Sequence, residues 1–289
     1  MMTDQPILAV IGGSGLYQFE GLEDVRTIEV ETPYGKPSSP VVIGTLCGKS
    51  VAFLARHGIG HFISPTEVNY RANIYALKSI GAKRIVSISA CGSLREDYAP
   101  GQIVIPDQLI DFTRDRKRSF FENGLVAHIS PADPFCIEIS TEIYQAVIQT
   151  NVVCHMGGSF ITIEGPRFST RGESNLFRAW GLSIIGMTAS PEAFLAREAE
   201  MCYGVLAHVT DYDVWHTSEA PVSVEMVIRT LQENTVNAQE VIRNLVKALP
   251  EDFECQCSNA LADALITNPA AIPAETRQNL GWLVDKYLP

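Results

Sequence analysis

Two aspartates stand almost side by side where an apolar part of the chain ends. The run YGVLAHV, residues 203–209, continues through Thr210 into Asp211, Tyr212 and Asp213. Residues at i and i+2 of an extended segment point to the same side, so we expect the two carboxylates to converge on one ligand. An ionised carboxylate only accepts hydrogen bonds, whereas a protonated one can also donate, so such a pair can do both.

This combination matches the edge of adenine, where N6 donates and N7 accepts. We expect one aspartate to accept from N6 and the other to give a proton to N7. An ordinary aspartate has a pKa of about 3.9, so this role requires burial or a like-charged neighbour, and Asp213 is such a neighbour for Asp211. Two alternatives stay open: a D-x-D pair can hold a divalent metal, as in some sugar-nucleotide enzymes, or cap a loop.

Groups suited to an oxyanion recur where other apolar runs end. An arginine–histidine pair follows one run, small hydroxyl residues follow two more, and the turn IGGSG supplies unhindered amides and a serine. Arginine offers a permanently charged fork, and glycine-rich turns form anion nests, although a tight turn or a surface ion pair would explain each motif alone. The predicted phosphate site consists of Ser14, Arg56, His57, Ser89, Ala90 and Thr188. A dinucleotide loop is not favoured, because LYQFEGLEDV is too short and broken for the helix it needs.

The elements that would position these residues alternate between strands and helices. We predict a strand into a glycine turn over residues 7–15, a hairpin over 41–58 joined near Gly48, a strand over 84–93, a strand and loop over 159–169, and a strand–loop–helix unit over 182–201. Helices are predicted over 64–81, about 140–150 and about 224–249. The first should begin at an N-cap, Ser64, with Glu67 completing a capping box.

The alternation implies an α/β fold, with one domain over residues 1–250 built on a central mixed β-sheet flanked by helices. Residues 251–289 should form a C-terminal helical extension packed on the domain or on an oligomer. In open α/β sheets, ligands bind beyond the carboxyl ends of strands, which is where the aspartates and the oxyanion groups fall.

Composition limits the partners. The 289 residues are 46% hydrophobic, enough for a large core, and the net charge of −11 argues against nucleic acid or an anionic membrane as a partner. No apolar stretch approaches the roughly 18 residues of a membrane span, and MMTDQPILAV lacks the basic region of a signal peptide. The seven scattered cysteines favour a reducing, cytoplasmic location.

Many motifs occur in an order that is similar to a known family. IGGSG, TPYGKPS, LARHG, VNYRANIYALK, ACGSLRE, DPFC, TIEGPRFSTR, GMT and TDYD, spread from about residue 7 to about residue 249, resemble the methylthioadenosine phosphorylase branch of the trimeric purine nucleoside phosphorylases. The resemblance implies a nucleoside phosphorylase-like fold and a pentosyltransferase. The implied reaction converts 5′-methylthioadenosine and phosphate to adenine and 5-methylthioribose 1-phosphate, with no metal or organic cofactor. Its setting would be purine and methionine salvage.

The resemblance also implies roles for single residues. Asp211 should face N7 and Asp213 should face N6. Further substrate contacts are expected from Cys91 and Phe168 near the base, from Met187 on the ribose and from Tyr212. Ser169 and Val224 match positions that tune specificity. His128 should reach into a neighbouring subunit's site near the 5′ group, which implies a homotrimer or a dimer of trimers. Gly186 departs from the pattern, because relatives often carry a polar residue there.

Alternative functions remain open. The nearest is a purine nucleoside phosphorylase that acts on adenosine, inosine or guanosine through a polar 5′ pocket. A metal-dependent sugar transferase, with Asp211 and Asp213 as ligands, and a nucleoside-binding protein without activity are the others.

The pair Cys255 and Cys257, in CQC, lies outside the closest likeness. Relatives from some thermophiles carry a similar C-x-C that takes part in disulfide chemistry. We expect free thiols here and no zinc site, because no second cysteine or histidine pair follows in the sequence.

Overall fold

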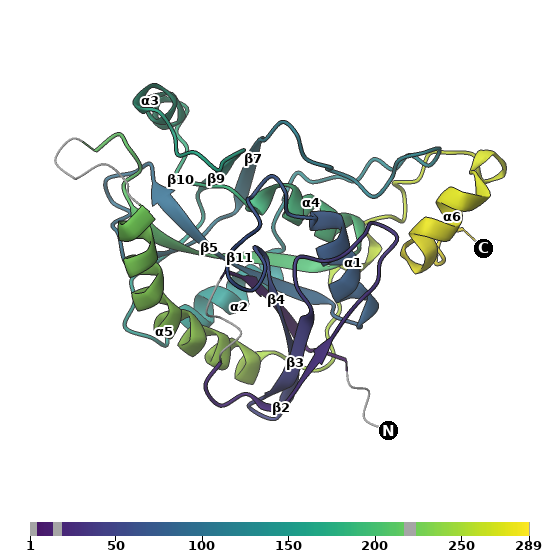
Figure 1. Ribbon diagram of the computed structural model, residues 1–289, viewed down its shortest axis with the longest axis horizontal. Coiled ribbons are helices and arrows are strands. Elements are labelled where there is room, and N and C mark those ends of the chain that lie inside the picture. Colours follow the sequence, from purple (N-terminus) through teal and green to yellow (C-terminus); the bar gives the residue numbers. More distant parts are fainter. Residues whose placement is uncertain (1–4, 14–18, 217–223, 289) are drawn as a thin grey trace.

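The centre of the molecule is a mixed β-sheet, which has eleven strands among the residues that the structure describes (Figure 1). The structure is a computed structural model, which describes residues 5–13, 19–216 and 224–288, the side chains of residues 224–234 excepted. The strands are β1 (Leu8–Gly12), β2 (Glu23–Ile28), β3 (Val41–Leu46), β4 (Lys49–Ala55), β5 (Arg84–Ser93), β6 (Ile103–Ile105), β7 (Gln108–Phe112), β8 (Cys154–Met156), β9 (Ser159–Ile163), β10 (Ile184–Gly186) and β11 (Cys202–Asp211). The helices are α1 (Tyr70–Ser79), α2 (Ile137–Val147), α3 (Arg171–Ala179), α4 (Ala189–Glu198), α5 (Val224–Ala248) and α6 (Ala274–Leu280).

Four strands at the middle of the sheet run parallel. β1 pairs with both β4 and β5, and β11 pairs with the other side of β5, all in the same direction. Their carboxyl ends therefore lie at one edge of the sheet. The antiparallel pairs β2–β3, β3–β4, β5–β10 and β6–β11 make the sheet mixed, as predicted.

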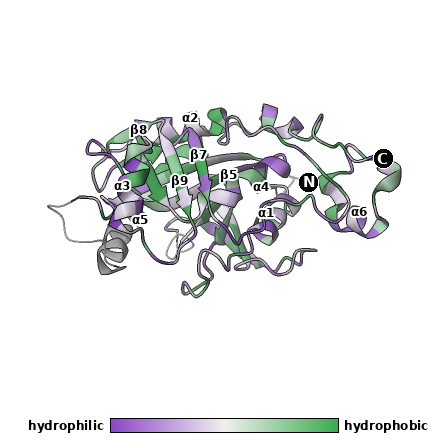
Figure 2. Ribbon diagram, turned by 90° about the horizontal axis from the view of Figure 1, so that it is seen from above, coloured by the Kyte–Doolittle hydropathy of each residue, from purple (hydrophilic) through white to green (hydrophobic). Residues whose placement is uncertain are grey.

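Helices cover both faces of the sheet and bury two apolar cores. Along β1, Leu8 and Val10 point to the face covered by α2 and α5, whereas Ala9 and Ile11 point to the face covered by α1 and α4. Because successive residues of a strand alternate between faces, an all-apolar strand is needed for a sheet covered on both sides. Figure 2 shows hydrophobic residues gathered in this sheet layer.

The hairpin over residues 41–58 is confirmed, and its turn explains the position of Gly48. Cys47 and Gly48 have φ of 52° and 78°. A two-residue type I′ turn needs positive φ at both positions, and glycine adopts it without steric cost.

The predicted start of the first helix is wrong. Ser64 does bond Glu67, with 2.6 Å between Oγ and Oε2, but these residues form a separate turn and α1 begins only at Tyr70. Asn69 is the N-cap: its side chain accepts from the amide of Ala72 and donates to the carbonyl of Tyr34. This second contact, between segments far apart in the sequence, holds the chain out of the helix until residue 70.

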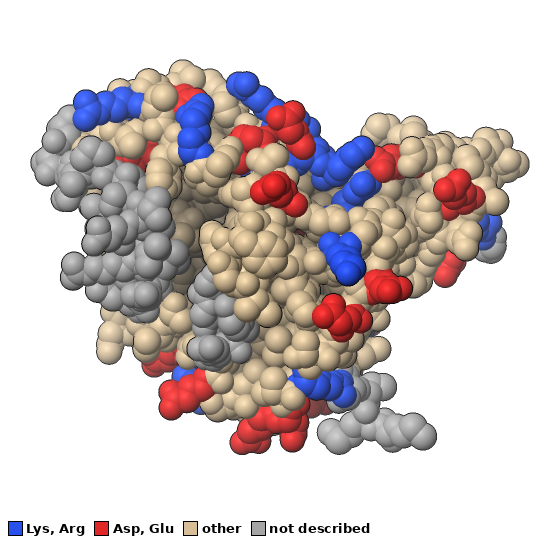
Figure 3. All heavy atoms as spheres, viewed as in Figure 1, with Lys and Arg blue, Asp and Glu red and all other residues tan. Residues whose placement is uncertain are grey.

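The C-terminal segment follows α5 and ends beside α6, at the far side of the molecule from α3 (Figure 1). Leu261, Leu280 and Val284 are buried in the same core as α1 and α4. On the face shown in Figure 3, acidic side chains gather along the lower edge, in the region of β2. Within the described residues, no helix is long and apolar enough to cross a membrane.

Candidate active site

The two aspartates lie together at the carboxyl end of β11, beside the end of β5. Asp211 and Asp213 are each about 8% exposed. A Cβ placed on Gly92 of β5 would lie 2.9 Å from Oδ1 of Asp211 and 3.3 Å from Cβ of Asp213. Only glycine leaves room for both side chains here, so the ends of the two strands form one compact carboxylate site.

The pair converges for a different reason than the one predicted. Pairing of β11 with β5 is irregular between Val209 and Asp211, and Asp213 has a φ of +52°, so the segment is not extended. The amide of Asp213 donates to Oδ1 of Asp211 over 2.7 Å, which closes a side-chain turn. Trp215 then donates from Nε1 to the carbonyl of Ser93 over 2.7 Å and ties the loop to β5.

Burial raises the pKa of both aspartates, as the proton-donor role requires. For Asp211 burial dominates, Thr210 and the amide of Asp213 oppose it, and the charge of Asp213 adds a smaller increase. For Asp213 burial also dominates, and the hydroxyls of Ser174 and Ser169 lie near enough to oppose it without reaching hydrogen-bonding distance. Oδ2 of Asp213 is buried and has no hydrogen-bond partner among the described residues. Such an atom is costly unless a ligand donates to it.

The guanidinium of Arg56 lies at the end of β4 and is buried in a polar cluster. It forms a two-pronged ion pair with Glu192 of α4, with Nε–Oε2 and Nη2–Oε1 distances of 2.8 and 2.9 Å. Nη2 also donates to Oγ of Ser87 over 2.7 Å, and Tyr203 donates to Glu192 over 2.8 Å. The sequence did not point to Glu192, which neutralises the positive charge expected of this site.

The hydroxyl groups of the predicted phosphate site do meet. Antiparallel pairing of β10 with β5 joins Ile184 to Ser93, and continuing that register places Thr188 opposite Ser89. Their hydroxyl oxygens are 3.5 Å apart, and Ser89 is also 3.5 Å from Oγ of Ser87. Thr188 is the N-cap of α4, but this helix end offers few free N–H groups to an anion, because Ser190 is not helical, its amide donates to Oγ1 of Thr162 over 3.1 Å, and Pro191 has no N–H. Ala90 lies beside Ser89 on β5, whereas Ser14 lies outside the described residues.

His57 can only accept at its free nitrogen when it is neutral. Nδ1 lies 2.9 Å from the carbonyl of Ile63, so this nitrogen must carry the proton. Burial, with the charge of Arg56, lowers the pKa of His57 to about 4, so the ring is neutral near pH 7. Nε2 is then an acceptor, which suits the P–OH group of hydrogen phosphate rather than its charged oxygens.

Arg116 organises the loops around the site and was missed in the sequence. Its side chain is about 1% exposed, and Nη1 donates to the carbonyls of Met187 and Ser190, both over 2.7 Å. The same guanidinium binds Glu164, whose pKa is held at about 2 by the amides of Arg114 and Asp115 and by other donors, against the effect of burial. The backbone of Met187 is thereby fixed next to Thr188.

The predicted base-pocket residues differ in exposure. Cys91 is buried and its Sγ lies 3.3 Å from the carbonyl of His208, so it faces β11. Phe168 is 36% exposed, whereas Ser169 is buried with its hydroxyl unbonded among the described residues. Tyr212 stacks on His216, with 4.7 Å between ring centroids. The side chain of Val224 lies outside the described part.

Gly186 lies where a side chain would collide with its neighbour. A Cβ at this position would lie 2.6 Å from Cζ of Phe160. The aromatic ring therefore occupies the space that a side chain at position 186 would need.

The segment that carries His128 is fixed to the C-terminal part of the chain. Ala127 pairs with Leu265 in a β-bridge, and the amide of His128 donates to the carbonyl of Ala264 over 2.8 Å. The side chain of His128 is exposed. The structure thus does not bring His128 into contact with the aspartates or with Arg56 among the described residues.

The reasoning that Cys255 and Cys257 have no further cysteine pair to join is wrong. Cys136 and Cys202 lie next to them, and the four sulfur atoms are within 4.8 Å of one another. Sequence spacing could not show this, because the ligands come from three separate parts of the chain.

Comparisons with known proteins agree with this fold. The family described as the phosphorylase superfamily matches residues 7–247. An S-methyl-5′-thioadenosine phosphorylase of Geobacter sulfurreducens is 53% identical, over 98% of this chain and 100% of the relative. One from Thermofilum pendens is 50% identical, over 90% of this chain and 98% of the relative.

Solved structures give the same result. A methylthioadenosine phosphorylase from an antarctic soil metagenomic library has a TM-score of 0.92 and 47% identity, over 97% of this chain and 99% of that one. The Schistosoma mansoni methylthioadenosine phosphorylase in complex with adenine has a TM-score of 0.81 and 36% identity, over 89% and 96%. The chain therefore belongs to the phosphorylase superfamily and groups there with the S-methyl-5′-thioadenosine phosphorylases.

Proposed function

We infer that this chain catalyses the phosphorolysis of 5′-methylthioadenosine to adenine and 5-methylthioribose 1-phosphate. The observation that carries the inference is that β5 bears both halves of the site. Ser89 belongs to the hydroxyl and guanidinium cluster, and Gly92 supports the two carboxylates. Three residues along a strand span about 10 Å, a separation that one purine nucleoside and a phosphate can bridge.

The carboxylates bind the base and activate it as a leaving group. Oδ2 of Asp213, which lacks a donor among the described residues, accepts from N6 of adenine. Asp211, whose pKa is raised by burial, donates a proton to N7 as the glycosidic bond lengthens. Protonation at N7 lets adenine leave as a neutral molecule, and this is general acid catalysis.

The phosphate is both the nucleophile and a counter-charge for the sugar. Nη1 of Arg56 donates one N–H group to the carbonyl of Ile88 over 3.3 Å, which leaves one of its five N–H groups free of Glu192, Ser87 and Ile88. This N–H group, Ser89 and Thr188 hold the phosphate against C1′, and Nε2 of His57 accepts from its protonated oxygen. Because Glu192 cancels the charge of Arg56, this part of the protein carries little net charge. The phosphate charge is therefore left to stabilise the oxocarbenium-like sugar, and positioning and preorganised dipoles supply the catalysis. Hydrogen phosphate loses its proton when it becomes the sugar phosphate dianion, and this proton replaces the one that Asp211 gave to N7, so the steps balance without a metal or organic cofactor.

The ribose and the 5′ group complete the substrate. Met187, held by Arg116, packs on the ribose, and Phe168 and Tyr212 offer aromatic surface to the base. His128 is proposed to approach the 5′-methylthio group of a neighbouring subunit, so the active species is proposed to be a homotrimer or a dimer of trimers. A cytoplasmic location stays a prediction from the cysteine pattern.

A second candidate is a phosphorylase that also accepts adenosine. The observation that favours it is the Schistosoma mansoni relative, which is described as an adenosine/methylthioadenosine phosphorylase. Adenine release from methylthioadenosine and adenosine, and hypoxanthine release from methylthioinosine and inosine, should be measured with and without phosphate. Phosphate-dependent release that is fastest for methylthioadenosine supports the main proposal. Tight nucleoside binding without release, or activity that a chelator abolishes, contradicts it.

A further inference from the structure

Four cysteines from three distant parts of the chain meet at one place. Cys136 is the N-cap of α2, Cys202 is the first residue of β11, and Cys255 and Cys257 flank the start of the 3-10 turn Gln256–Asn259. Cys136, Cys202 and Cys257 are buried and Cys255 is half-buried, and none of them forms a disulfide. The active site plays no part in holding them, because the aspartates lie at the opposite end of β11, about 30 Å away along a ten-residue strand.

The arrangement of the sulfur atoms fits a tetrahedral metal ion. All four lie within 4.8 Å of one another, and Sγ of Cys136 is 3.5 Å from Sγ of Cys255. Zinc bound to four thiolates has zinc–sulfur distances of about 2.3 Å, so the sulfur atoms stand about 3.8 Å apart along each edge of the tetrahedron. The thiols already occupy positions close to these, so little movement is needed to bind the ion.

Groups around the cluster provide charge and hydrogen bonds for such a centre. Four thiolates around a divalent ion carry a net charge of −2, which needs nearby positive charge in a buried place. Arg84 is buried and stands opposite Cys202 in the pairing of β5 with β11, and its guanidinium lies over the ring of Phe253, 4.1 Å from the ring centroid. Nε of Arg84 is buried without a hydrogen-bond partner among the described residues. The amide of Cys257 also points to Sγ of Cys255 at 3.5 Å, as amides do toward metal-bound sulfur.

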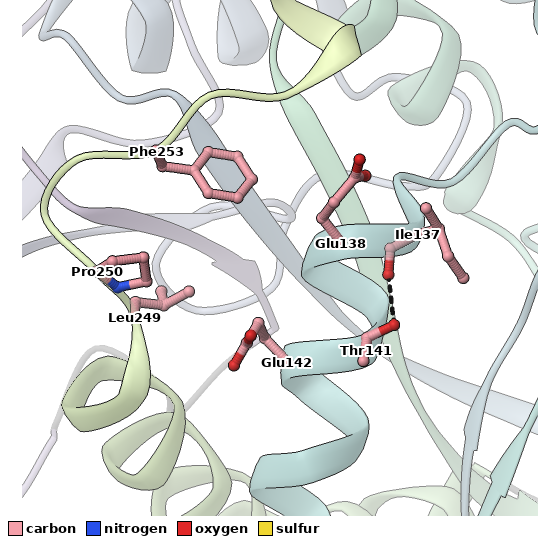
Figure 4. Close-up of a pocket in the computed structure, with 7 residues that line it drawn as sticks. All are labelled: Ile137, Glu138, Thr141, Glu142, Leu249, Pro250 and Phe253. Carbon is pink, nitrogen blue, oxygen red and sulfur yellow. Dashed lines mark hydrogen bonds between the residues drawn. The ribbon is translucent and has the colours of Figure 1, made fainter.

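A surface pocket next to the cluster offers a route for the ion. Figure 4 shows Glu138 and Glu142 on one turn after another of α2, facing Leu249, Pro250 and Phe253 across the pocket. Sγ of Cys136 lies 3.1 Å from Oε2 of Glu138, so Glu138 both lines the pocket and contacts one sulfur atom of the cluster. Acidic oxygens at this position attract a divalent cation, and the protons that the thiols release pass to the solvent.

We propose that Cys136, Cys202, Cys255 and Cys257 form a structural tetrathiolate site for zinc. One zinc ion binds four thiols, four protons leave, and no electron is transferred, so the site needs no oxidant. Zinc suits the position because soft thiolate ligands select it and because four protein ligands leave no open place for catalysis.

The ion would fasten the C-terminal segment to the domain. Cys255 and Cys257 begin the segment that continues to Leu261, whose amide donates to Glu200, and to Leu265, which pairs with Ala127. The segment therefore holds the loop that carries His128. Binding free energy of a structural zinc ion appears as folding free energy, so metal should raise the thermal stability of this chain.

Metal content of the full chain tests the proposal. The chain, without a histidine tag, is purified under reducing conditions from zinc-supplemented cells, dialysed, and its zinc per chain is measured by mass spectrometry. One zinc per chain is expected for the unmodified chain and for Cys47→Ser, an exposed cysteine away from the cluster. Cys255→Ser and Cys257→Ser should lose it, because even an outer-shell partner is worth about 10–100-fold in metal affinity and a ligand is worth at least that.

Cobalt titration of the zinc-free chain gives a readout that does not depend on the variants folding well. A tetrahedral tetrathiolate produces intense visible d–d absorption with a sulfur-to-cobalt charge-transfer band, and zinc then displaces the cobalt. Zinc should also raise the melting temperature of the unmodified chain and of Cys47→Ser. The proposal is overturned if the reduced chain binds no zinc or cobalt, if Cys47→Ser loses metal like Cys255→Ser, or if the four cysteines are isolated as disulfides from reducing cells.

Discussion

Asp213→Asn should change which purines the site accepts while leaving the fold intact. Asp213 has a positive φ, and asparagine tolerates this conformation better than most residues, so the substitution adds little backbone strain. The side chains have the same shape. The variant therefore removes a negative charge and an acceptor from the site, and adds a donor, at nearly constant geometry.

The size of the preference for 6-amino over 6-oxo purines follows from the burial of Asp213. Asp213 is about 8% exposed and Oδ2 has no donor among the described residues, so water does not weaken its effect on the ligand. When an ionised carboxylate faces O6 of a 6-oxopurine, both groups are acceptors and no hydrogen bond can form between them. Leaving a buried polar group unpaired in this way costs about 1–3 kcal/mol. Since 1.4 kcal/mol is one decade, the unmodified chain should prefer methylthioadenosine over methylthioinosine by about tenfold or more in kcat/KM. An amide can donate to O6 or accept from N6, so Asp213→Asn should narrow this ratio.

The free energy of unfolding of Asp213→Asn shows whether a change in purine preference comes from the site or from damage to the fold. Burial raises the pKa of Asp213, so the folded chain keeps this proton to a higher pH than the unfolded chain. The free energy of unfolding therefore falls as pH rises above about 3.9, and asparagine removes that loss. Asp213→Asn should be at least as stable as the unmodified chain at pH 7 in urea unfolding.

Two companion variants complete the experiment. Asp97→Asn alters an exposed carboxylate that is paired with Arg95. It should leave the preference for methylthioadenosine over methylthioinosine unchanged and should alter the free energy of unfolding by no more than a few tenths of a kcal/mol. Asp211→Asn should lower kcat for every purine, because an amide cannot deliver a proton to N7. The assignment fails if Asp213→Asn keeps the full preference for the 6-amino purine, or if Asp211→Asn keeps normal turnover.

Three further perturbations test other parts of the structure. Arg56→Ala should lower the free energy of unfolding by about 3–5 kcal/mol, because it leaves Glu192 buried without its partner. Adding Glu192→Gln should restore most of this stability in urea unfolding, but it should not restore the KM for phosphate. Full recovery of that KM would contradict the phosphate role of Arg56. Burial raises the pKa of Glu198 to about 7, so the free energy of unfolding should fall by about 3 kcal/mol between pH 4.5 and 7. Glu198→Gln should make the free energy of unfolding nearly independent of pH over this range. Denaturation at several pH values measures this dependence, and an unchanged slope in the variant would refute the prediction. His128→Ala should raise the KM for methylthioadenosine without altering the KM for phosphate. Sedimentation of the unmodified chain should find an oligomer at assay concentration, and a fully active monomer would contradict a site shared between subunits.

Local patterns predicted the sheet and the ends of its strands well. Apolar runs bounded by glycine turns indicated β1, the β3–β4 hairpin and β5, and strand ends in α/β sheets are where ligands bind. Asp211, Ser89 and Thr188 are predicted as site residues because polar residue types are unusual in or directly after buried strands, and the structure places them near the carboxyl ends of β5, β10 and β11. Predicting these strands and their ends did not require knowledge of which strands are neighbours in the sheet.

Contacts between distant segments were not predictable in the same way. Asn69 ends up as the N-cap of α1 because it also binds Tyr34, and no local pattern reveals that contact. Glu192 and Arg116 resemble ordinary charged residues in the sequence. Their functions come from the partners that the fold brings to them, Arg56 in one case and the backbone of Met187 in the other.

The costly features of this chain are concentrated where the ligand is proposed to bind. Asp213 combines a left-handed backbone with a buried oxygen that lacks a donor, and Gly92 gives up a side chain to make room for it. Each feature lowers the free energy of unfolding without a bound purine, and none is needed to form the sheet. A chain selected for stability alone would remove them, as Asp213→Asn does in part. Their presence together at the ends of β5 and β11 is therefore best explained by a requirement of the ligand, and the cost should be recovered as extra thermal stability when adenine binds.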